Sequence, residues 1–203
     1  MYNVITIGRQ FGSGGRELGR RLAEELSFAY YDDEVLRAIA ERTSLTSEYI
    51  EQVIEHKPAP LLPITIGRTL YAHTAPSFDQ LQAVYREQSS IIVEMAEKSP
   101  CVIVGRCADY ILRDHSPFNI FVYADMESRI ARCRLKAREG EEEYSDKELE
   151  KRIKRVDKDR ASYYEFYTGQ TWGDPMNFDM CINTSRADIK KIARVLAPIF
   201  TGA

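Results

Sequence analysis

A glycine-rich segment near the start of the chain constrains the fold more than any other feature. Residues 8–17 have the sequence Gly-Arg-Gln-Phe-Gly-Ser-Gly-Gly-Arg-Glu and follow the apolar run Val4–Ile7. The next stretch, Leu18–Leu26, carries leucine and alanine at helical spacing. A strand, a glycine turn and a helix in this order bring backbone N–H groups to a helix N-terminus, where the peptide dipoles favour an anion. The segment therefore predicts a phosphate-binding loop.

The segment departs from the usual phosphate-loop motif, G-x-x-x-x-G-K-[S/T], at the lysine. Gly15 stands at the lysine position, and Arg16 follows it. Four glycines within eight residues, between the first strand and the first helix, favour a ligand site over a plain turn. A dinucleotide-binding loop is a weaker alternative. Gly12, Gly14 and Gly15 do not keep the G-x-G-x-x-G spacing, although an aspartate pair lies near the expected distance.

Composition narrows the class of protein. The chain has 203 residues, of which 44% are hydrophobic and 29% charged, as expected for one globular domain. A net charge of −3 argues against a general binder of nucleic acid or of membrane surfaces. The four cysteines are scattered without a C-x-x-C pair, which is typical of reduced thiols. We therefore predict a single cytoplasmic domain over residues 1–203, with neither nucleic acid nor a membrane as partner.

Apolar runs with strand character alternate with segments of helical periodicity. The predicted strands are Val4–Ile7, Phe28–Tyr31, Cys101–Gly105, Phe118–Ala124 and Phe178–Asn183. The predicted helices are Leu18–Leu26, Glu34–Arg42, Ser47–His56, Phe78–Lys98, Met126–Arg138, Asp146–Tyr167 and Ala187–Phe200. This alternation is typical of a three-layer α/β domain with a mainly parallel sheet. In such sheets, ligands bind beyond the carboxyl ends of the strands.

An arginine stands where that rule places the ligand. Arg106 follows Gly105 at the carboxyl end of the predicted strand 101–105. A planar guanidinium there suits bidentate binding of phosphate oxygens. The alternative is a surface arginine paired with a carboxylate such as Asp109, and strand-end position favours phosphate binding.

Two predicted helices with basic faces flank the acidic segment 139–144. The basic faces hold Arg129, Arg132 and Lys136 on the first helix and Lys151, Arg155 and Lys158, together with Asp159, on the second. Such a pair predicts a lid over a polyphosphate, since it would exclude water and neutralise charge during transfer. Solvated helix faces with intrahelical ion pairs are the alternative. The aromatic run 163–167 predicts side chains that pack in the core rather than stack on a base.

Together these motifs resemble the cytidylate-kinase-like branch of the P-loop nucleoside monophosphate kinases. The resemblance is carried by Ile5-Thr6-Ile7 with the glycine loop, Leu22–Leu26 leading to Asp32, Gly105-Arg106, the segment 124–132 and Arg155-x-x-x-Asp159. It extends from residue 2 to about residue 200. It implies a P-loop NTPase fold with a five-stranded parallel sheet of order 2-3-1-4-5, helices on both faces and a helical lid. Within the domain it places an acceptor-binding insertion at about 33–98 and the lid at about 129–160.

The resemblance also implies roles for individual residues and a cofactor, MgATP. The residues that would bind ATP are Gly12, Ser13, Gly14, Gly15, Arg16, Glu17, Arg129 and Arg132. The residues that would bind the acceptor are Asp33, Arg86, Arg106, Arg155 and Asp159. The implied partners are a nucleotide donor and a small-molecule acceptor, most simply a nucleoside monophosphate such as CMP.

Departures from the family pattern fall on both halves of this site. Gly15 replaces the lysine, Glu17 replaces the threonine whose hydroxyl helps bind magnesium, and Asp33 replaces a serine. A lost cation at a transferring phosphoryl group costs roughly 3–4 kcal/mol by analogy with an oxyanion donor. We predict that Arg16 takes over the lysine's work and that Glu17 or Asp33 binds Mg²⁺.

Three functions compete on this pattern. The first is a kinase in which Arg16, Asp33 and Arg132 are catalytic and MgATP phosphorylates a small acceptor. Asp33 would suit an alcohol acceptor better than a phosphate. The second is a catalytically weak or inactive nucleotide-binding regulatory protein, because several family residues are missing together. The third, a nicotinamide-dependent oxidoreductase, rests only on the weak dinucleotide alternative.

Overall fold

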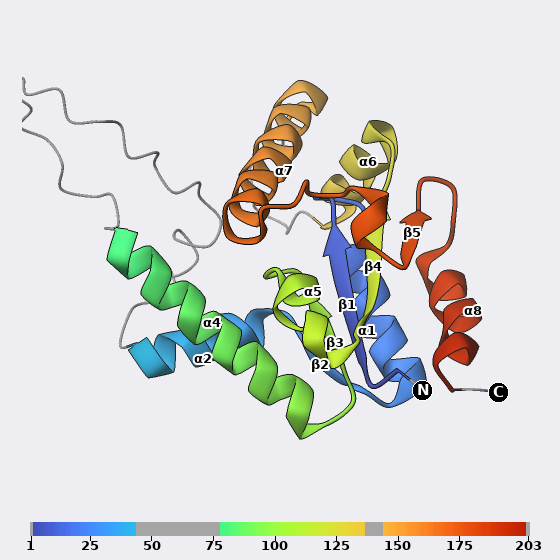
Figure 1. Cartoon of the computed structure of the whole chain (residues 1–203). Helices are drawn as coiled ribbons and strands as arrows, with labels where there is room; N and C mark the ends of the chain where they lie inside the picture. Colours follow the sequence, from blue (N-terminus) through green and yellow to red (C-terminus); the bar gives the residue numbers. More distant parts are fainter. Residues whose placement is uncertain (1, 44–77, 137–143, 202–203) are drawn as a thin grey trace, which may run out of the picture.

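A five-stranded parallel sheet forms the centre of the molecule. The computed structural model describes residues 2–43, 78–136 and 144–201 (Figure 1). The strands are β1 (Val4–Arg9), β2 (Ala29–Tyr31), β3 (Cys101–Val104), β4 (Phe118–Tyr123) and β5 (Met180–Asn183). They lie in the order β2-β3-β1-β4-β5, and every neighbouring pair is parallel. The predicted order 2-3-1-4-5 is confirmed, and each predicted strand is present with its ends within two residues.

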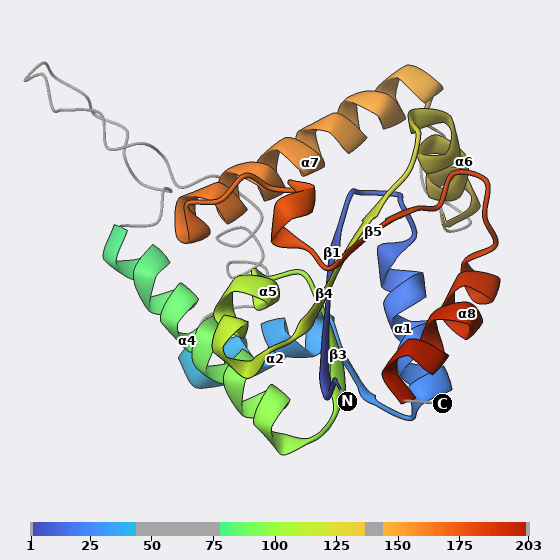
Figure 2. The same ribbon diagram turned by 45° about the vertical axis from the view of Figure 1, so that its right-hand side comes forward.

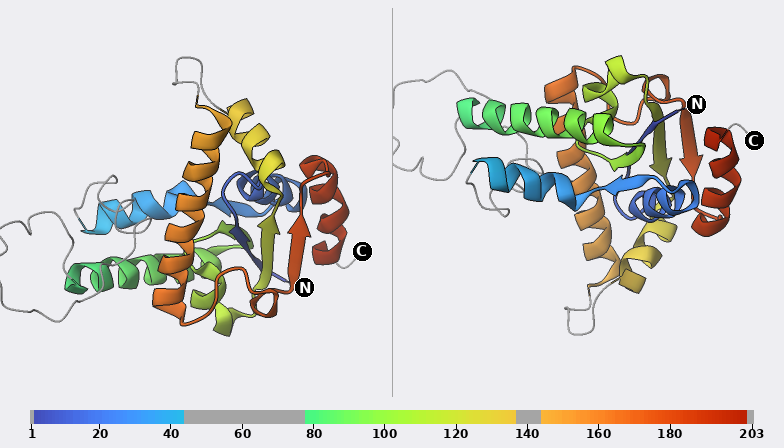
Figure 3. Two further views of the ribbon diagram at one scale, coloured as in Figure 1. Left: turned by 90° about the horizontal axis from the view of Figure 1, so that it is seen from above. Right: turned by 90° about the horizontal axis from the view of Figure 1, so that it is seen from below.

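Helices cover both faces of this sheet (Figures 1 and 2). The helices are α1 (Gly15–Leu26), α2 (Asp33–Thr43), α4 (Phe78–Lys98), α5 (Ala108–Ile111), α6 (Met126–Lys136), α7 (Asp146–Thr168) and α8 (Ile189–Thr201), with 3₁₀ turns η1 (Arg113–His115) and η2 (Pro175–Asn177). Helices α1 and α8 lie on one face, and α2, α4 and α5 lie on the other. Helix α7 crosses above the carboxyl ends of the strands (Figure 3).

The strands form because their residues are apolar on both sides. In β1, Val4 joins the cluster under α2 and α4, whereas Ile5 and Ile7 join the cluster under α1 and α8. In β3, Ile103 faces the first cluster, and Val102 faces the second. A parallel sheet that is buried on both faces requires such continuous apolar runs. The two clusters hold β1 and β3 rigidly, and the loops that follow them form the site.

Helix α7 has clear local signals at both ends. The Ser145 hydroxyl accepts from the backbone N–H of Glu148, and the Glu148 carboxylate accepts from the backbone N–H of Ser145, which forms a capping box. The helix ends at Gly169, which adopts a φ of 69°. These caps set where α7 begins and ends.

Some sequence predictions fall wholly or partly outside the described residues. The predicted helix 47–56 lies entirely outside them. The predicted insertion 33–98 is described through α2 and α4, which pack against each other, and the predicted lid 129–160 is described through α6 and α7. The division of the chain into these parts remains a prediction. Among the described helices, none combines the length and apolar character needed to cross a membrane.

Candidate functional site

The glycine loop connects β1 to the N-terminus of α1. Gly14 caps the helix with a φ of 85° and no side-chain hydrogen bond. The first amides of α1, from Gly15 onward, lack intrahelical acceptors because they begin the helix. Ser13 is fully buried, and its hydroxyl donates to the carbonyl of Gln10 at 2.8 Å. The loop can therefore offer an anion its backbone amides and the positive end of the helix dipole.

A buried ion pair locks the loop to the two basic helices. The Arg129 side chain is held by the Asp157 carboxylate, and its Nε donates to the carbonyl of Phe11 at 2.7 Å. The other oxygen of Asp157 accepts from the Phe11 amide at 2.7 Å. A Cβ at Gly12 would lie 3.0 Å from the Arg129 carbonyl oxygen. Arg129, predicted to bind ATP, thus contacts the loop backbone directly.

Arg132 lies on the outer side of the same loop. One of its terminal nitrogens donates to the carbonyl of Thr184, and Thr184 in turn donates from its hydroxyl to the carbonyl of Ser13 at 2.6 Å. The other terminal nitrogen, Nη1, is buried without a hydrogen-bond partner in the described structure. The Nε of Arg132 would lie 3.8 Å from a Cβ at Gly14. An unsatisfied guanidinium beside a helix N-terminus fits an anionic ligand.

Arg16 and Glu17 are each engaged in ion pairs. Arg16 is half-exposed, and its guanidinium lies 2.8 Å from Asp32 and 3.1 Å from Asp33. Glu17 lies 2.9 Å from Arg21 on the next turn of α1. No group of three or more metal-ligating side chains occurs among the described residues. Mg²⁺ usually uses one or two carboxylates together with substrate phosphates. Asp32 has the donor chemistry for that role, and one of its buried carboxylate oxygens has no hydrogen-bond partner among the described residues.

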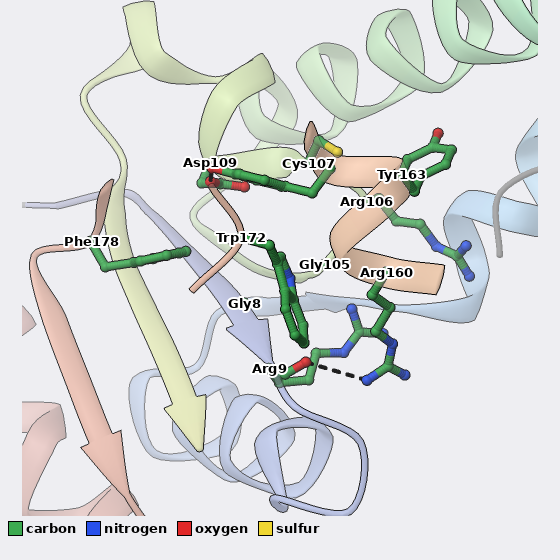
Figure 4. Close-up of a pocket in the computed structure, with 11 residues that line it drawn as sticks. Gly8, Arg9, Gly105, Arg106, Cys107, Asp109, Arg160, Tyr163, Trp172 and Phe178 are labelled. Atoms are coloured by element: carbon green, nitrogen blue, oxygen red, sulfur yellow. Dashed lines mark hydrogen bonds between the residues drawn. The ribbon is translucent and has the colours of Figure 1, made fainter. Parts of the chain in front are cut away.

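A pocket opens beyond the carboxyl ends of β1 and β3 (Figure 4). Its lining residues are Gly8, Arg9, Gly105, Arg106, Cys107, Asp109, Arg160, Tyr163, Tyr164, Trp172 and Phe178. Gly105, Arg106 and Cys107 all have positive φ, between 54° and 72°, and form the turn from β3 to α5. Non-glycine residues rarely adopt this region, and such strain concentrates at ligand sites.

Three guanidinium groups meet in this pocket. Arg106 is buried, and its Nε has no hydrogen-bond partner among the described residues. Arg160 donates to the carbonyl of Arg9 at 3.3 Å. The Arg9 Nε is also buried and has no hydrogen-bond partner among the described residues. Asp32 lies 3.9 Å from the Arg9 guanidinium. Burial, followed by repulsion from Arg160, lowers the pKa of Arg9, and attraction to Asp32 opposes the shift. The lining of the pocket therefore carries an excess of positive charge.

Aromatic side chains also line the pocket. Tyr163 and Tyr164 are buried against the core, as predicted for the aromatic run, and both also line the pocket. The Tyr164 hydroxyl donates to Asp109 at 2.6 Å, and burial raises the pKa of Asp109. Asp109 is thus paired with a tyrosine, and no ion pair between Asp109 and Arg106 occurs among the described residues. Cations beside aromatic rings suit a ligand that combines an anion with a flat ring.

The structure does not bring every predicted residue to this pocket. Arg86 is exposed on α4 and contacts Gln82 at 3.5 Å. Arg155 is exposed and Asp159 partly exposed on α7, and neither lines the pocket. Asp33 begins α2 and is exposed beside Arg16. The substrate contacts expected of these residues remain predictions.

Three residues of the site were missed by the sequence analysis: Arg9, Asp157 and Arg160. Arg9 lies within the glycine segment itself, so its basic side chain was a visible signal. Asp157 and Arg160 lie on the basic helix α7, but Asp157 is at an unspecified position within the motif Arg155-x-x-x-Asp159, and Arg160 follows the motif. Helical spacing alone does not tell which face of α7 meets the loop.

The sheet order and the phosphate loop define the class: this is a P-loop NTPase fold of the type found in small-molecule kinases. Solved structures support the fold. The chain aligns with shikimate kinase from Acinetobacter baumannii at a TM-score of 0.55 and 13% identity, over 100% of this chain and 94% of that one. It aligns with an uncharacterized protein from Eubacterium ventriosum at a TM-score of 0.71 and 26% identity, over 98% and 99% of the two chains.

The chain belongs to the cytidylate kinase-like family, whose sequence profile matches residues 4–186. A cytidylate kinase from Methanopyrus kandleri is 27% identical over 184 residues, covering 90% of this chain and 85% of the relative. One from Pyrobaculum aerophilum is 25% identical over 193 residues, covering 95% and 89%. The predicted resemblance is therefore confirmed, and the family is one of nucleotide and small-molecule kinases.

Proposed function

We propose that this protein transfers a phosphoryl group from MgATP to a small anionic acceptor, most simply a nucleoside monophosphate such as CMP. The carrying observation is the group of three arginines that lines the pocket next to the glycine loop: Arg106 is buried, and Arg9 and Arg160 are partly buried. The loop suits the donor phosphates, and the pocket suits an acceptor with an anion and a ring. Its family membership and its cytidylate kinase relatives support this assignment.

The residues supply positioning and charge, which are the main needs of phosphoryl transfer. The amides of Gly14 and Gly15 would hold donor phosphates, and Arg132 would add a guanidinium from the side of α6. Bound Mg²⁺ would neutralise phosphate charge. As the bond from the γ-phosphorus to ADP breaks and a bond to the acceptor oxygen forms, the arginines stabilise the charge that passes to ADP. Asp33 would accept the proton of a hydroxyl acceptor, whereas a phosphate acceptor presents an oxygen that is already anionic.

Acceptor-dependent release of ADP tests this function. We expect CMP or another nucleoside monophosphate to stimulate ADP release well above the rate with water, and Arg106→Ala to raise the acceptor KM at least tenfold. Arg20→Ala, an exposed change on α1, should leave the rate unchanged. Small alcohols belong in the same panel, because their turnover would redirect the acceptor assignment toward a hydroxyl.

A regulatory nucleotide-binding role is the second candidate. It is favoured by the ion pairs that engage Arg16 and Glu17, since Arg16 is the residue expected to do the lysine's work and Glu17 stands at the position of the family threonine. Calorimetry that finds tight ATP binding, together with no turnover on any acceptor, would support this role and refute the kinase.

A further inference from the structure

Two departures from the phosphate-loop motif touch each other in space. When the motif G-x-x-x-x-G-K-[S/T] is laid on residues 9–16, its first glycine falls on Arg9 and its lysine on Gly15. A Cβ at Gly15 would lie 2.5 Å from the Cβ of Arg9 and 3.1 Å from its Cγ. Side chains at both positions would overlap, so the loop has room for only one. The chain has exchanged the two: the small residue is where the lysine stands, and the cation is where the first glycine stands.

The Arg9 side chain runs from the donor loop to the acceptor pocket. The Cβ of Arg9 lies against Gly15, at the N-terminus of α1. At the other end of the side chain, Nη1 would lie 1.7 Å from a Cβ at Gly105, just after β3. Arg9 and Gly105 are both labelled in Figure 4. Gly105 thus leaves the space that the guanidinium occupies. The Arg9 side chain is only 11% exposed. The Arg9 cation is therefore held between the two halves of the site, which is where charge shifts during phosphoryl transfer.

The surroundings of Arg9 favour the binding of an anion. Arg160, Arg106 and Arg16 all repel its charge, and Asp32 is the acid that attracts it. Asp32 also pairs with Arg16 at 2.8 Å, so one carboxylate is shared between two cations. The buried Arg9 Nε has no hydrogen-bond partner in the described structure. Buried charges and donors are normally paired, and a phosphate would pair this one.

We propose that Arg9 performs the work of the missing lysine by binding the transferred phosphoryl group from the opposite wall of the loop. This inference rests on the proposed function and assigns its central cation to Arg9. Arg16, the residue expected from the sequence, is drawn toward the start of α2 by Asp32 and Asp33. The proposed role of Arg9 also explains why a glycine stands at the lysine position, because a side chain at Gly15 would overlap Arg9.

A double-mutant cycle tests the exchange. Arg9→Gly should lower kcat at least 100-fold, and Arg9→Lys should keep it within about tenfold of the wild type. Gly15→Lys alone should lower the melting temperature, since its Cβ overlaps Arg9. The pair Arg9→Gly with Gly15→Lys should recover the melting temperature and at least tenfold of the kcat that Arg9→Gly loses. Arg20→Ala serves as the surface control, and Arg16→Ala should lower kcat less than Arg9→Gly.

A binding measurement separates this inference from the kinase assignment. Calorimetry with inorganic tripolyphosphate should show affinity at least tenfold weaker for Arg9→Gly than for the wild type, with adenosine binding unchanged. If the wild type transfers phosphate to no acceptor, the kinase assignment fails, and the tripolyphosphate result still decides the role of Arg9. Unchanged tripolyphosphate affinity, a kcat for Arg9→Gly within threefold of the wild type, or a double variant no more active than Arg9→Gly overturns the inference.

Discussion

Single side chains carry much of the organisation of the loop. The Asp157 carboxylate binds both the Phe11 amide and the buried Arg129 guanidinium, so it joins α7, α6 and the glycine loop. Arg129 also donates to the Phe11 carbonyl. The position of the loop amides thus depends on one acid that the sequence motif does not mark.

Asp157→Ala should destabilise the protein by about 3 kcal/mol, because it leaves Arg129 as a buried charge without its partner. Urea unfolding of the two proteins measures the difference in free energy. The matched control is Glu150→Ala on the same helix, which breaks an exposed ion pair with Lys154 and should cost less than about 0.5 kcal/mol. Equal losses for the two variants would refute the locking role.

At the scale of elements, two helices hold the turn that carries Arg106. Gln88 on α4 is fully buried, and its side-chain amide donates to the Arg106 carbonyl at 2.9 Å. The Tyr163 hydroxyl on α7 donates to the Gln88 carbonyl oxygen at 3.3 Å. The turn of three left-handed residues, 105–107, is therefore held directly by α4 and, through Gln88, by α7. The helix packing decides where the Arg106 guanidinium lies.

Gln88→Leu should lower stability by about 1–3 kcal/mol, since the Arg106 carbonyl and the Tyr163 hydroxyl lose their partner. It should also raise the KM for the acceptor more than the KM for ATP, because it loosens the acceptor side of the site. Ser89→Ala, at the next position of α4, removes only a hydrogen bond within that helix and is the control. Equal increases in the KM for the acceptor and the KM for ATP would contradict this role.

At the scale of the whole molecule, the loops that follow β1 and β3 face α7 above the carboxyl edge of the sheet (Figures 1 and 3). A ligand bound there contacts several elements that separate on unfolding. It should therefore stabilise the entire domain by mass action.

MgATP at about 100 times its Kd should raise the unfolding free energy by about 2.7 kcal/mol. For a chain of this length that corresponds to a rise in melting temperature of about 5–11 °C. Differential scanning fluorimetry measures the shift. Adenosine at the same concentration should give a much smaller shift, since it lacks the phosphates that we propose the loop binds. A shift from adenosine as large as that from MgATP would refute phosphate recognition by the loop.

Local patterns in the chain were enough to predict the layered fold and the place of the donor loop. Apolar strand runs, helical spacing and the glycine segment act between near neighbours, so strands, helices and the loop follow from short stretches of sequence. The same holds for Arg106, whose position after β3 was predicted from the strand itself. The family was also evident from motif order, and its sequence profile confirms it.

Only the folded molecule decided which charged side chains meet. Arg9 and Gly15 compete for one space, Arg160 reaches Arg9 from α7, and Asp157 reaches Phe11 across more than a hundred residues. Such contacts depend on the rotation and packing of helices against the sheet, which residue spacing does not specify. The sequence shows that a lysine is missing from a phosphate loop. The packing of β1 against α1 shows that an arginine occupies the space beside it, because two side chains cannot fill the same volume.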